Sequence, residues 1–401
     1  MTTASWRTPT IVIVVGCLIA LLTFGVRAGF GLFLQPMSST LGWGREIFAF
    51  AIAVQNLLWG LGQPFAGALA DRYGSGRVLA SGGLLYTLGI FLMAQTSTPG
   101  MLTLSAGVLV GLGLAGASFS VVLASISRMV SAEKRSWALG MGTAAGSLGQ
   151  FLMVPLGQAF LSAYGWSFAL VLLSGCIALV IPLSAALTGK SGEAELGKEQ
   201  TMGEALREAS GHAGYWYLTA GFFVCGFHVA FIQTHLPAYL SDAGIAAGVG
   251  AWALSMVGLF NVIGSYTSGV MGGRYSKKYL LSLLYLARAI AIALFILAPL
   301  STASVLVFSA VIGLLWLSTV PLTSGLVAQL FGTRYMATLF GIVFFSHQVG
   351  AFLGVWLGGY FYDVTGSYAI VWWFGVALGV MAALLHWPID ERPAPRLVTA
   401  M

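Results

Sequence analysis

Two arginines stand inside long apolar segments of this chain. Arg27 lies in the apolar run 11–34, nine residues before Pro36, and Arg288 lies nine residues after Tyr279 in the run 279–298. At 1.5 Å per helical residue, Arg27 is roughly 13 Å from Pro36 and Arg288 is roughly 14 Å from Tyr279. A charge at that depth in a bilayer costs at least about 2.5–3.5 kcal/mol on insertion scales, so it normally faces a cavity or a partner.

Acidic residues are missing from the central parts of the apolar segments. Glu46, Asp242 and Asp363 stand at segment ends. Because a guanidinium binds carboxylate or phosphate through two parallel hydrogen bonds, a buried arginine without a carboxylate partner favours an incoming anion. We therefore expect Arg27 to bind a small anionic substrate. The alternative is a structural arginine bonded to the carbonyls of a helix interrupted near Gly29.

Further polar residues inside the apolar segments are candidates for substrate contact. They are His228, His347, Gln348, Gln233, Asn56 and Arg288. Imidazole titrates near pH 6.5, so His228 and His347 could carry protons during transport. Each histidine could instead be a hydrogen-bonded packing residue, and Arg288 could brace the eighth or tenth helix.

The elements that position these residues are predicted by composition. Of 401 residues, 58% are hydrophobic and only 7% are charged, so lipid must solvate most of the surface. The net charge is +6, and the basic residues are spread over short loops rather than clustered on one face. We therefore interpret them as signals that orient the protein in the membrane, not as a nucleic-acid-binding surface. Cys17, Cys176 and Cys225 lie in apolar segments without metal or disulfide spacing. We expect no metal, no cofactor and no catalytic group.

Hydropathy predicts an all-α membrane protein with twelve transmembrane helices in two six-helix bundles. The segments are 11–34, 46–69, 78–96, 102–127, 137–160, 166–187, 215–240, 247–271, 279–298, 303–328, 335–361 and 368–388. The predicted N-terminal bundle is 1–187 and the C-terminal bundle is 215–401. The polar stretch 188–214 between them is predicted to be a solvated linker with one surface helix. Lysine and arginine gather in the loops on one side, which places both termini and the linker in the cytoplasm.

An internal repeat relates the two halves. Gly25 and Arg27 with Pro36 align with Gly226 and His228 with Pro237, at an offset of 201. The loop 67–74 (GALADRYG) recurs in weaker form at 269–276 (GVMGGRYS). A duplication of six helices accounts for both matches.

The loop 67–74 resembles the motif that follows the second helix of the major facilitator superfamily. This resemblance implies two pseudo-symmetric six-helix bundles and, for Asp71, Arg72 and Arg274, a role in gating. The alternative is that these residues only set topology. Overall character is similar to the monocarboxylate transporter and oxalate–formate antiporter branch. That branch often has an arginine after a glycine in the eighth span, where this chain has Gly264 followed by Ser265.

These observations predict a secondary transporter, not an enzyme, that moves small organic anions such as mono- or dicarboxylates by alternating access. Coupling is to protons or to a counter-anion. The alternatives are an efflux permease for apolar or zwitterionic compounds and a non-transporting sensor on the same fold. We expect a monomer in a bacterial cytoplasmic membrane, with no nucleic-acid partner.

Overall fold

The computed structural model describes residues 8–118, 121–123, 125–126, 132–188, 201–332 and 335–394, with backbone alone at 71, 132–140, 143 and 337. All regular elements in this part of the chain are helical. In the first half they are α1 (Pro9–Ala28), η1 (Phe30–Phe33), α2 (Leu34–Leu41), α3 (Arg45–Tyr73), α4 (Ser75–Met93), α5 (Pro99–Leu102), η2 (Thr103–Leu109), α6 (Val110–Gly116), α8 (Ala132–Ala178), α9 (Val180–Leu183) and η3 (Ser184–Leu187). In the second half they are α10 (Met202–Ser210), α11 (Ala213–Asp242), α12 (Ala247–Gly272), α13 (Lys277–Leu297), α14 (Thr302–Leu315), α15 (Thr319–Phe331), α16 (Met336–Thr365) and α17 (Ala369–His386).

The described helices are long enough to cross a membrane repeatedly. Eleven candidate spans are found in this part of the chain, and one of them, 144–187, is 44 residues long. A single bilayer crossing needs only about 20 residues. The long span turns back at Gly165, whose φ of 77° and ψ of 170° are not helical, so it crosses twice. The prediction of a twelve-helix, all-α membrane protein is confirmed.

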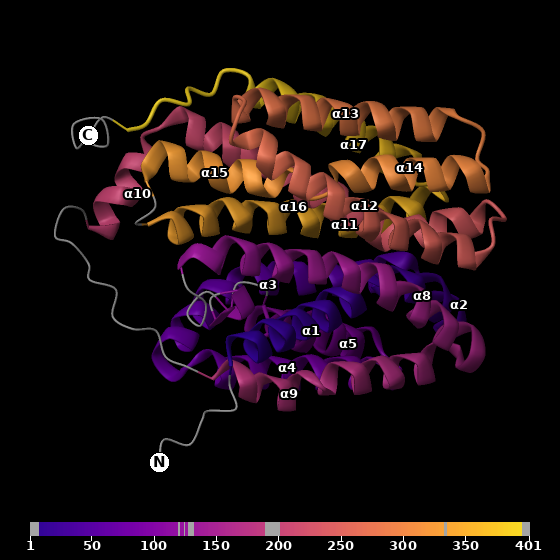
Figure 1. Cartoon of the computed structure of the whole chain (residues 1–401). Helices are drawn as coiled ribbons and strands as arrows, with labels where there is room; N and C mark the ends of the chain where they lie inside the picture. The colour runs from indigo at the N-terminus through magenta and orange to yellow at the C-terminus, as the bar shows by residue number, and fades with distance from the viewer. Residues whose placement is uncertain are drawn as a thin grey trace, which may run out of the picture.

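The helices form two bundles whose axes run side by side (Figure 1). Helices α1 to α9 make one bundle and α11 to α17 make the other, while α3 packs on α16, α8 on α12 and η1 on α11 across the boundary. We call the end where α1 begins and α17 ends the terminal end. The opposite end, with the α2–α3, α11–α12 and α16–α17 connections, is the far end.

The sequence repeat has a packing counterpart. A Cβ on Gly25 of α1 would lie 2.5 Å from the carbonyl oxygen of Gly149 in α8. A Cβ on Gly226 of α11 would lie 1.7 Å from the carbonyl oxygen of His347 in α16. Such distances leave no room for a side chain, so glycine lets the backbones touch in the same way in both halves.

Two spans are interrupted, one beside the half-buried Arg27 and one beside the buried Arg288. The first span changes at Gly29 from α1 into the 3₁₀ turn η1 and then into α2. The tenth span stops at Leu315 in α14 and resumes at Thr319 in α15. Interrupted helices leave backbone carbonyls without helical partners, and in a membrane these must be satisfied inside the protein.

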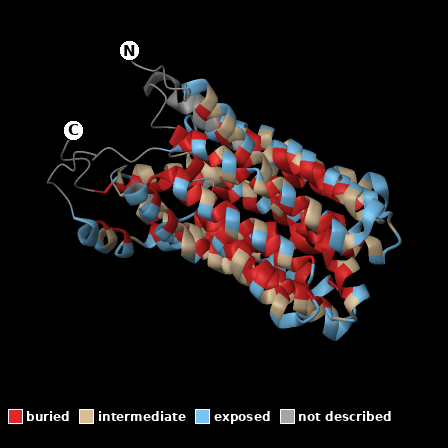
Figure 2. Ribbon diagram, turned by 90° about the horizontal axis from the view of Figure 1, so that it is seen from below, coloured by how far each residue is buried: buried red, intermediate tan, exposed pale blue. Residues whose placement is uncertain are grey.

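Burial follows the environment that composition predicts. Buried residues lie mainly where helices face one another, whereas exposed residues gather on the outer surface and at the helix ends (Figure 2). Large apolar side chains such as Leu297 and Leu384 are more than two-thirds exposed, at 69% and 68%. In a transmembrane bundle these side chains face lipid. The surface helix predicted in the linker is α10, which begins with a capping box between Thr201 and Glu204.

Candidate functional site

Arg27 reaches the boundary between the bundles from the last turn of α1. Its Nη1 donates a 3.1 Å hydrogen bond to Oε1 of Gln233 in α11, and its Nη2 donates a 2.6 Å bond to Oδ1 of Asn56 in α3. Its guanidinium carbon lies 4.7 Å from the ring centroid of Trp59. One side chain therefore joins both bundles at the middle of the membrane-spanning region.

Local contacts orient the amides around Arg27. The Nδ2 of Asn56 donates to the carbonyl oxygen of Ile52 at 2.8 Å, which turns Oδ1 toward the guanidinium. A Cβ on Gly31 would lie 2.2 Å from the carbonyl oxygen of Gln233, so glycine in η1 lets α11 come this close. The backbone contact thus places Gln233 opposite Arg27.

The charge of Arg27 is not neutralised by a carboxylate. Its hydrogen-bond partners are the neutral amides of Asn56 and Gln233. The Nε is buried without a hydrogen-bond partner. Within the described residues, no acidic side chain contacts the guanidinium. Such a cation has unused capacity for an anionic ligand, because charge-assisted hydrogen bonds to carboxylates are about twice as strong as neutral ones.

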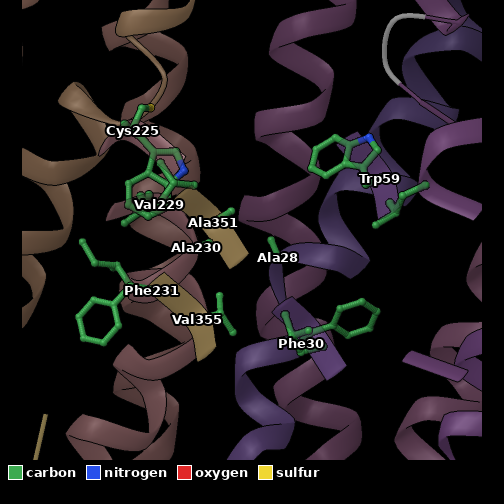
Figure 3. Close-up of a cluster of buried hydrophobic side chains, with 14 of the residues drawn as sticks. Ala28, Phe30, Trp59, Cys225, Val229, Ala230, Phe231, Ala351 and Val355 are labelled. Atoms are coloured by element: carbon green, nitrogen blue, oxygen red, sulfur yellow. The ribbon is translucent and has the colours of Figure 1, made fainter. Parts of the chain in front are cut away.

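The cavity next to Arg27 is small in this conformation. Its volume is about 10 Å³, enough for about one water molecule. Residues from both bundles line it, namely Arg27, Phe30, Gly31, Ile52, Gln55, Asn56, Ala230, Gln233 and Thr234. Figure 3 shows apolar neighbours facing this boundary, with Ala28 and Phe30 on one side and Ala230 on the other. A larger ligand could bind only if the two bundles move apart here.

Arg288 lies within the C-terminal bundle rather than beside Arg27. Its Nε donates a 3.0 Å bond to the carbonyl oxygen of Leu315, and its Nη2 bonds the carbonyl oxygen of Trp316. Both carbonyls belong to the interruption between α14 and α15. The structure therefore places Arg288 as a brace on the tenth span, with 1% of its surface exposed.

The two candidate proton carriers lie in different surroundings. His228 faces α17, where its Nε2 is 2.7 Å from the carbonyl oxygen of Gly375. His347 lies in α16, with its Nδ1 3.1 Å from Oε1 of Gln348. Gln348 reaches the other bundle, since a Cβ on Gly60 of α3 would lie 2.7 Å from its Cγ. The structure thus groups His347 and Gln348 near the boundary and separates His228 from it.

An ion pair joins the bundles at the far end. Arg45, at the start of α3, donates from Nη2 and Nη1 to the two carboxylate oxygens of Asp242 at 2.6 and 2.7 Å. Its Nη1 also donates to the hydroxyl of Tyr368 at 2.9 Å, and its guanidinium carbon lies 3.7 Å from the ring centroid of Tyr362. We call Arg45, Asp242 and Tyr368 the far-end lock.

Asp363 strengthens this junction through the end of a helix. Its carboxylate accepts hydrogen bonds from the backbone N–H groups of Arg45 and Glu46, at 2.9 and 2.8 Å. These are the first N–H groups of α3, which have no partner inside that helix. A carboxylate from α16 therefore caps and balances the N-terminal end of a helix in the other bundle. Glu46 in turn accepts a 3.0 Å bond from Nε1 of Trp356.

Contacts between the bundles extend from the far end to the middle. Along α3 they run from Arg45 to Gly60, and along α12 they end at Asn261, whose Nδ2 donates to Ser147 of α8 at 2.9 Å. In the middle, the rings of Trp59 in α3 and Phe344 in α16 also meet, with 5.6 Å between their centroids. The structure is thus closed at the far end.

The gating candidates lie at the terminal end. Arg72 is exposed, with its guanidinium carbon 5.2 Å from the ring centroid of its neighbour Tyr73. Arg274 is also exposed, after the end of α12. The side chain of Asp71 lies outside the described residues. Their gating role stays a prediction.

The residues of the far-end lock are not among the site residues predicted from the sequence. The sequence does contain a signal, because Arg45 directly precedes the predicted segment 46–69, while Glu46, Asp242 and Asp363 also stand at segment ends. Opposite charges on one side of a membrane are available to pair, but hydropathy does not say which of them meet.

Comparison with known proteins identifies this architecture. A family model described as "Major Facilitator Superfamily" matches residues 16–355. "Monocarboxylate transporter 13" of Rattus norvegicus is 30% identical over 365 residues, covering 86% of this chain and 81% of the relative. "Oxalate:formate antiporter" of Oxalobacter formigenes is 24% identical over 355 residues, covering 86% and 83%.

Solved structures share the fold. A bacterial homologue of the human lysosomal transporter Spinster, described as inward-facing and unoccupied, superposes with a TM-score of 0.79 at 15% identity, covering 98% of this chain and all of that one. A D-xylose-proton symporter superposes with a TM-score of 0.76 at 14% identity, covering 96% and 99%. At these identities the likeness establishes the fold alone.

Proposed function

The chain belongs to the major facilitator superfamily, and we propose that it is a secondary transporter of small organic anions, with Arg27 as the substrate-binding cation. Transporters of this superfamily bind small molecules. Relatives named for monocarboxylates and for oxalate and formate support a carboxylate as the substrate here. The residues at Arg27 support it independently.

The observation that carries this proposal is the unneutralised guanidinium of Arg27 between the two bundles. Its Nη groups bond neutral amides and its Nε has no partner. A substrate carboxylate would take the positions that the oxygens of Asn56 and Gln233 now occupy. Substrate affinity is greatest when the amides of Asn56 and Gln233 stay close enough to form hydrogen bonds with the substrate themselves.

Binding at this place couples to movement of the bundles. The hydrogen bond between Arg27 and Gln233 crosses the boundary between the bundles. A substrate that enters there breaks this bond and instead contacts Arg27 in one bundle and Gln233 in the other. The far-end lock closes the opposite side. Alternating access then requires the lock to open while the terminal end closes, with the substrate held between the bundles.

The orientation follows from the basic loops. We place the terminal end, both termini and the linker 188–214 in the cytoplasm, and the two bundles, within 1–187 and 215–401, act as the moving domains of a monomer in a bacterial cytoplasmic membrane. In this orientation the structure faces the cytoplasm. Asp71, Arg72 and Arg274 would then form the contacts that close the terminal end in the opposite state.

The test is a binding and uptake comparison in the purified, reconstituted protein. A panel of mono- and dicarboxylates and of uncharged compounds is screened by the shift in melting temperature, and active compounds are followed as labelled substrates in proteoliposomes. Arg27→Gln removes two charge-assisted bonds worth about 3 kcal/mol together, so affinity should fall about a hundredfold. Arg27→Lys keeps the positive charge but lacks the planar guanidinium, so its affinity should lie between those of the wild type and Arg27→Gln.

The exposed Arg77 offers a matched control, because Arg77→Gln removes the same charge away from the boundary. It should leave affinity within about twofold, as distant surface changes do. If only uncharged compounds stabilise the protein, and Arg27→Gln leaves that response intact, the chain is instead a permease for apolar or zwitterionic compounds.

A further inference from the structure

Arg288 is a buried cation inside the C-terminal bundle. Its Nε and Nη2 bond backbone carbonyls at the interruption of the tenth span, and its Nη1 is buried without a hydrogen-bond partner. Carbonyl oxygens carry only partial negative charge, so they solvate the guanidinium without neutralising it. An uncompensated charge in this environment is unfavourable by several kcal/mol.

The described acidic side chains of this bundle lie at its two ends. Asp242 and Asp363 bond Arg45 at the far end. Asp390 pairs with Arg392 at the terminal end, and Glu391 accepts from the backbone of Lys278 there. All four carboxylates lie in the last turn of a helix or beyond it and are bonded at the two ends of the bundle, so no described carboxylate is available to Arg288. Any negative charge close to it must come from another ionisable group.

Two such groups stand beside Arg288, and Cys225 is the stronger acid of the two. The Sγ of Cys225 in α11 is 3.3 Å from Oγ1 of Thr319, and that Oγ1 is 3.4 Å from Nη2 of Arg288. The ring centroid of Tyr285 is 5.3 Å from the guanidinium carbon. An ordinary thiol ionises near pH 8.5 and an ordinary phenol near pH 10. The thiol is therefore the group that can balance the arginine.

His347 connects this thiol to the boundary between the bundles. The imidazole packs on α11 against Phe222, one turn before Cys225, with 5.0 Å between the ring centroids. Its Nδ1 donates to Oε1 of Gln348 at 3.1 Å, which leaves Nε2 as the nitrogen that can accept a proton. Gln348 packs on Gly60 of the N-terminal bundle. Figure 3 shows Cys225 on α11, with Trp59 across the boundary.

The remaining ionisable neighbours are engaged elsewhere. His228, on the same helix as Cys225, bonds the carbonyl of Gly375 in α17. His386 of α17 stacks on Tyr285 at 5.0 Å between ring centroids and bonds a carbonyl of its own helix. The groups that face the thiol are thus Arg288 and Tyr285 from α13, Thr319 from α15 and His347 from α16.

We infer that Cys225 and His347 form the proton-carrying pair of this transporter, in place of an intramembrane carboxylate; this rests on the proposed transport function. The proton leaves Sγ of Cys225 for Nε2 of His347, which gives a thiolate balanced by Arg288 through Thr319 and an imidazolium beside Gln348. The imidazolium returns its proton to water when the bundles separate at Gln348. The reverse steps reload the thiol.

The experiment compares acid-driven uptake with substrate exchange in proteoliposomes. Cys225→Ser keeps a polar contact to Thr319 but cannot ionise, so an imposed pH gradient should no longer accelerate uptake. Exchange of labelled for unlabelled substrate needs no net proton movement and should stay within about twofold of the wild type. Cys225→Asp restores an acid of ordinary pKa about 3.9, so acid stimulation should return with its profile displaced to lower pH.

Two other cysteines supply matched controls. Cys17→Ser and Cys176→Ser remove half-buried thiols of the N-terminal bundle and should leave acid stimulation unchanged. Retained acid stimulation in Cys225→Ser, or a wild-type protein that exchanges anions without any acid stimulation, would overturn the proton role while leaving the proposed function intact. Absence of binding and exchange of every anion in the wild type would overturn the proposed function itself. Gel filtration and melting temperature establish that each variant is folded.

Discussion

Opening of the far-end lock can be forced by one substitution, Asp242→Asn. The lock exists only while the far end is closed, so its loss lowers the stability of this state relative to the opposite one. The ion pair is bidentate, with side-chain exposures of 10% for Arg45 and 29% for Asp242. A pair at this depth lies between a surface pair, worth at most about 1 kcal/mol, and a fully buried one, whose disruption costs about 3–5 kcal/mol. We expect about 2 kcal/mol, or about a thirtyfold shift in population.

Pulsed electron spin resonance measures this shift. Spin labels are attached to cysteines introduced at Thr40 and Thr302, two exposed far-end positions on opposite bundles, in a background without Cys17 and Cys176. Asp242→Asn should add or enlarge a population with a longer distance between the labels. Substrate-free protein in lipid nanodiscs is the sample, because detergent could change the balance between states.

The exposed pair of Arg392 with Asp390 is the matched control. Its oxygen–nitrogen distance is also 2.6 Å, but the side chains are 87% and 48% exposed. Solvent screening makes such a pair worth little, so Asp390→Asn should leave the distance distribution unchanged. An unchanged distribution in Asp242→Asn as well would refute the view that the lock holds the far end closed.

Three further outcomes are expected. Gly31→Ala places a Cβ 2.2 Å from the carbonyl oxygen of Gln233 and should push the bundles apart. The distance between the spin labels at positions 40 and 302 should then increase, and substrate affinity should fall. Gly67→Ala is the control, because a Cβ there has no atom within 4 Å, and it should change neither quantity. Arg288→Gln leaves the buried carbonyls of Leu315 and Trp316 without their hydrogen-bond donor and should lower the stability of the protein by about 3 kcal/mol, measured as loss of melting temperature; an unchanged melting temperature would contradict the brace. His228→Gln should lower the melting temperature while acid-driven uptake persists, and loss of that uptake in a folded variant would place His228 in the proton path instead.

Much of the architecture was readable from the sequence because a bilayer permits few solutions. Apolar segments of about 20 residues must be helices in lipid, since the backbone has no water to bond. Within the described residues the predicted segments therefore match the observed spans, although 137–160 and 166–187 are joined at Gly165 into one long helical element. The internal repeat was visible for the same physical reason that it packs, because close helix contact needs glycine at Gly25 and at Gly226.

Arg27 could be singled out from the sequence, but its surroundings could not. A charge deep in an apolar run is unfavourable wherever the helix lies, so its importance is independent of tertiary structure. Its partners Asn56 and Gln233 come from positions 29 and 206 residues away, and only the packing of α3 and α11 brings them to one point. Arg288 carried the same sequence signal and braces a broken helix instead.

The sequence by itself determined that this chain crosses a membrane in twelve helices with a cation stranded in the first of them, because hydropathy and the energy of burying charge act on each segment alone. Tertiary structure decided the rest. It turned His228 toward Gly375 of α17 and placed His347 beside Gln348 near the boundary between the bundles. It also joined Arg45 to Asp242, since the choice among several opposite charges depends on which helix ends meet when two bundles close.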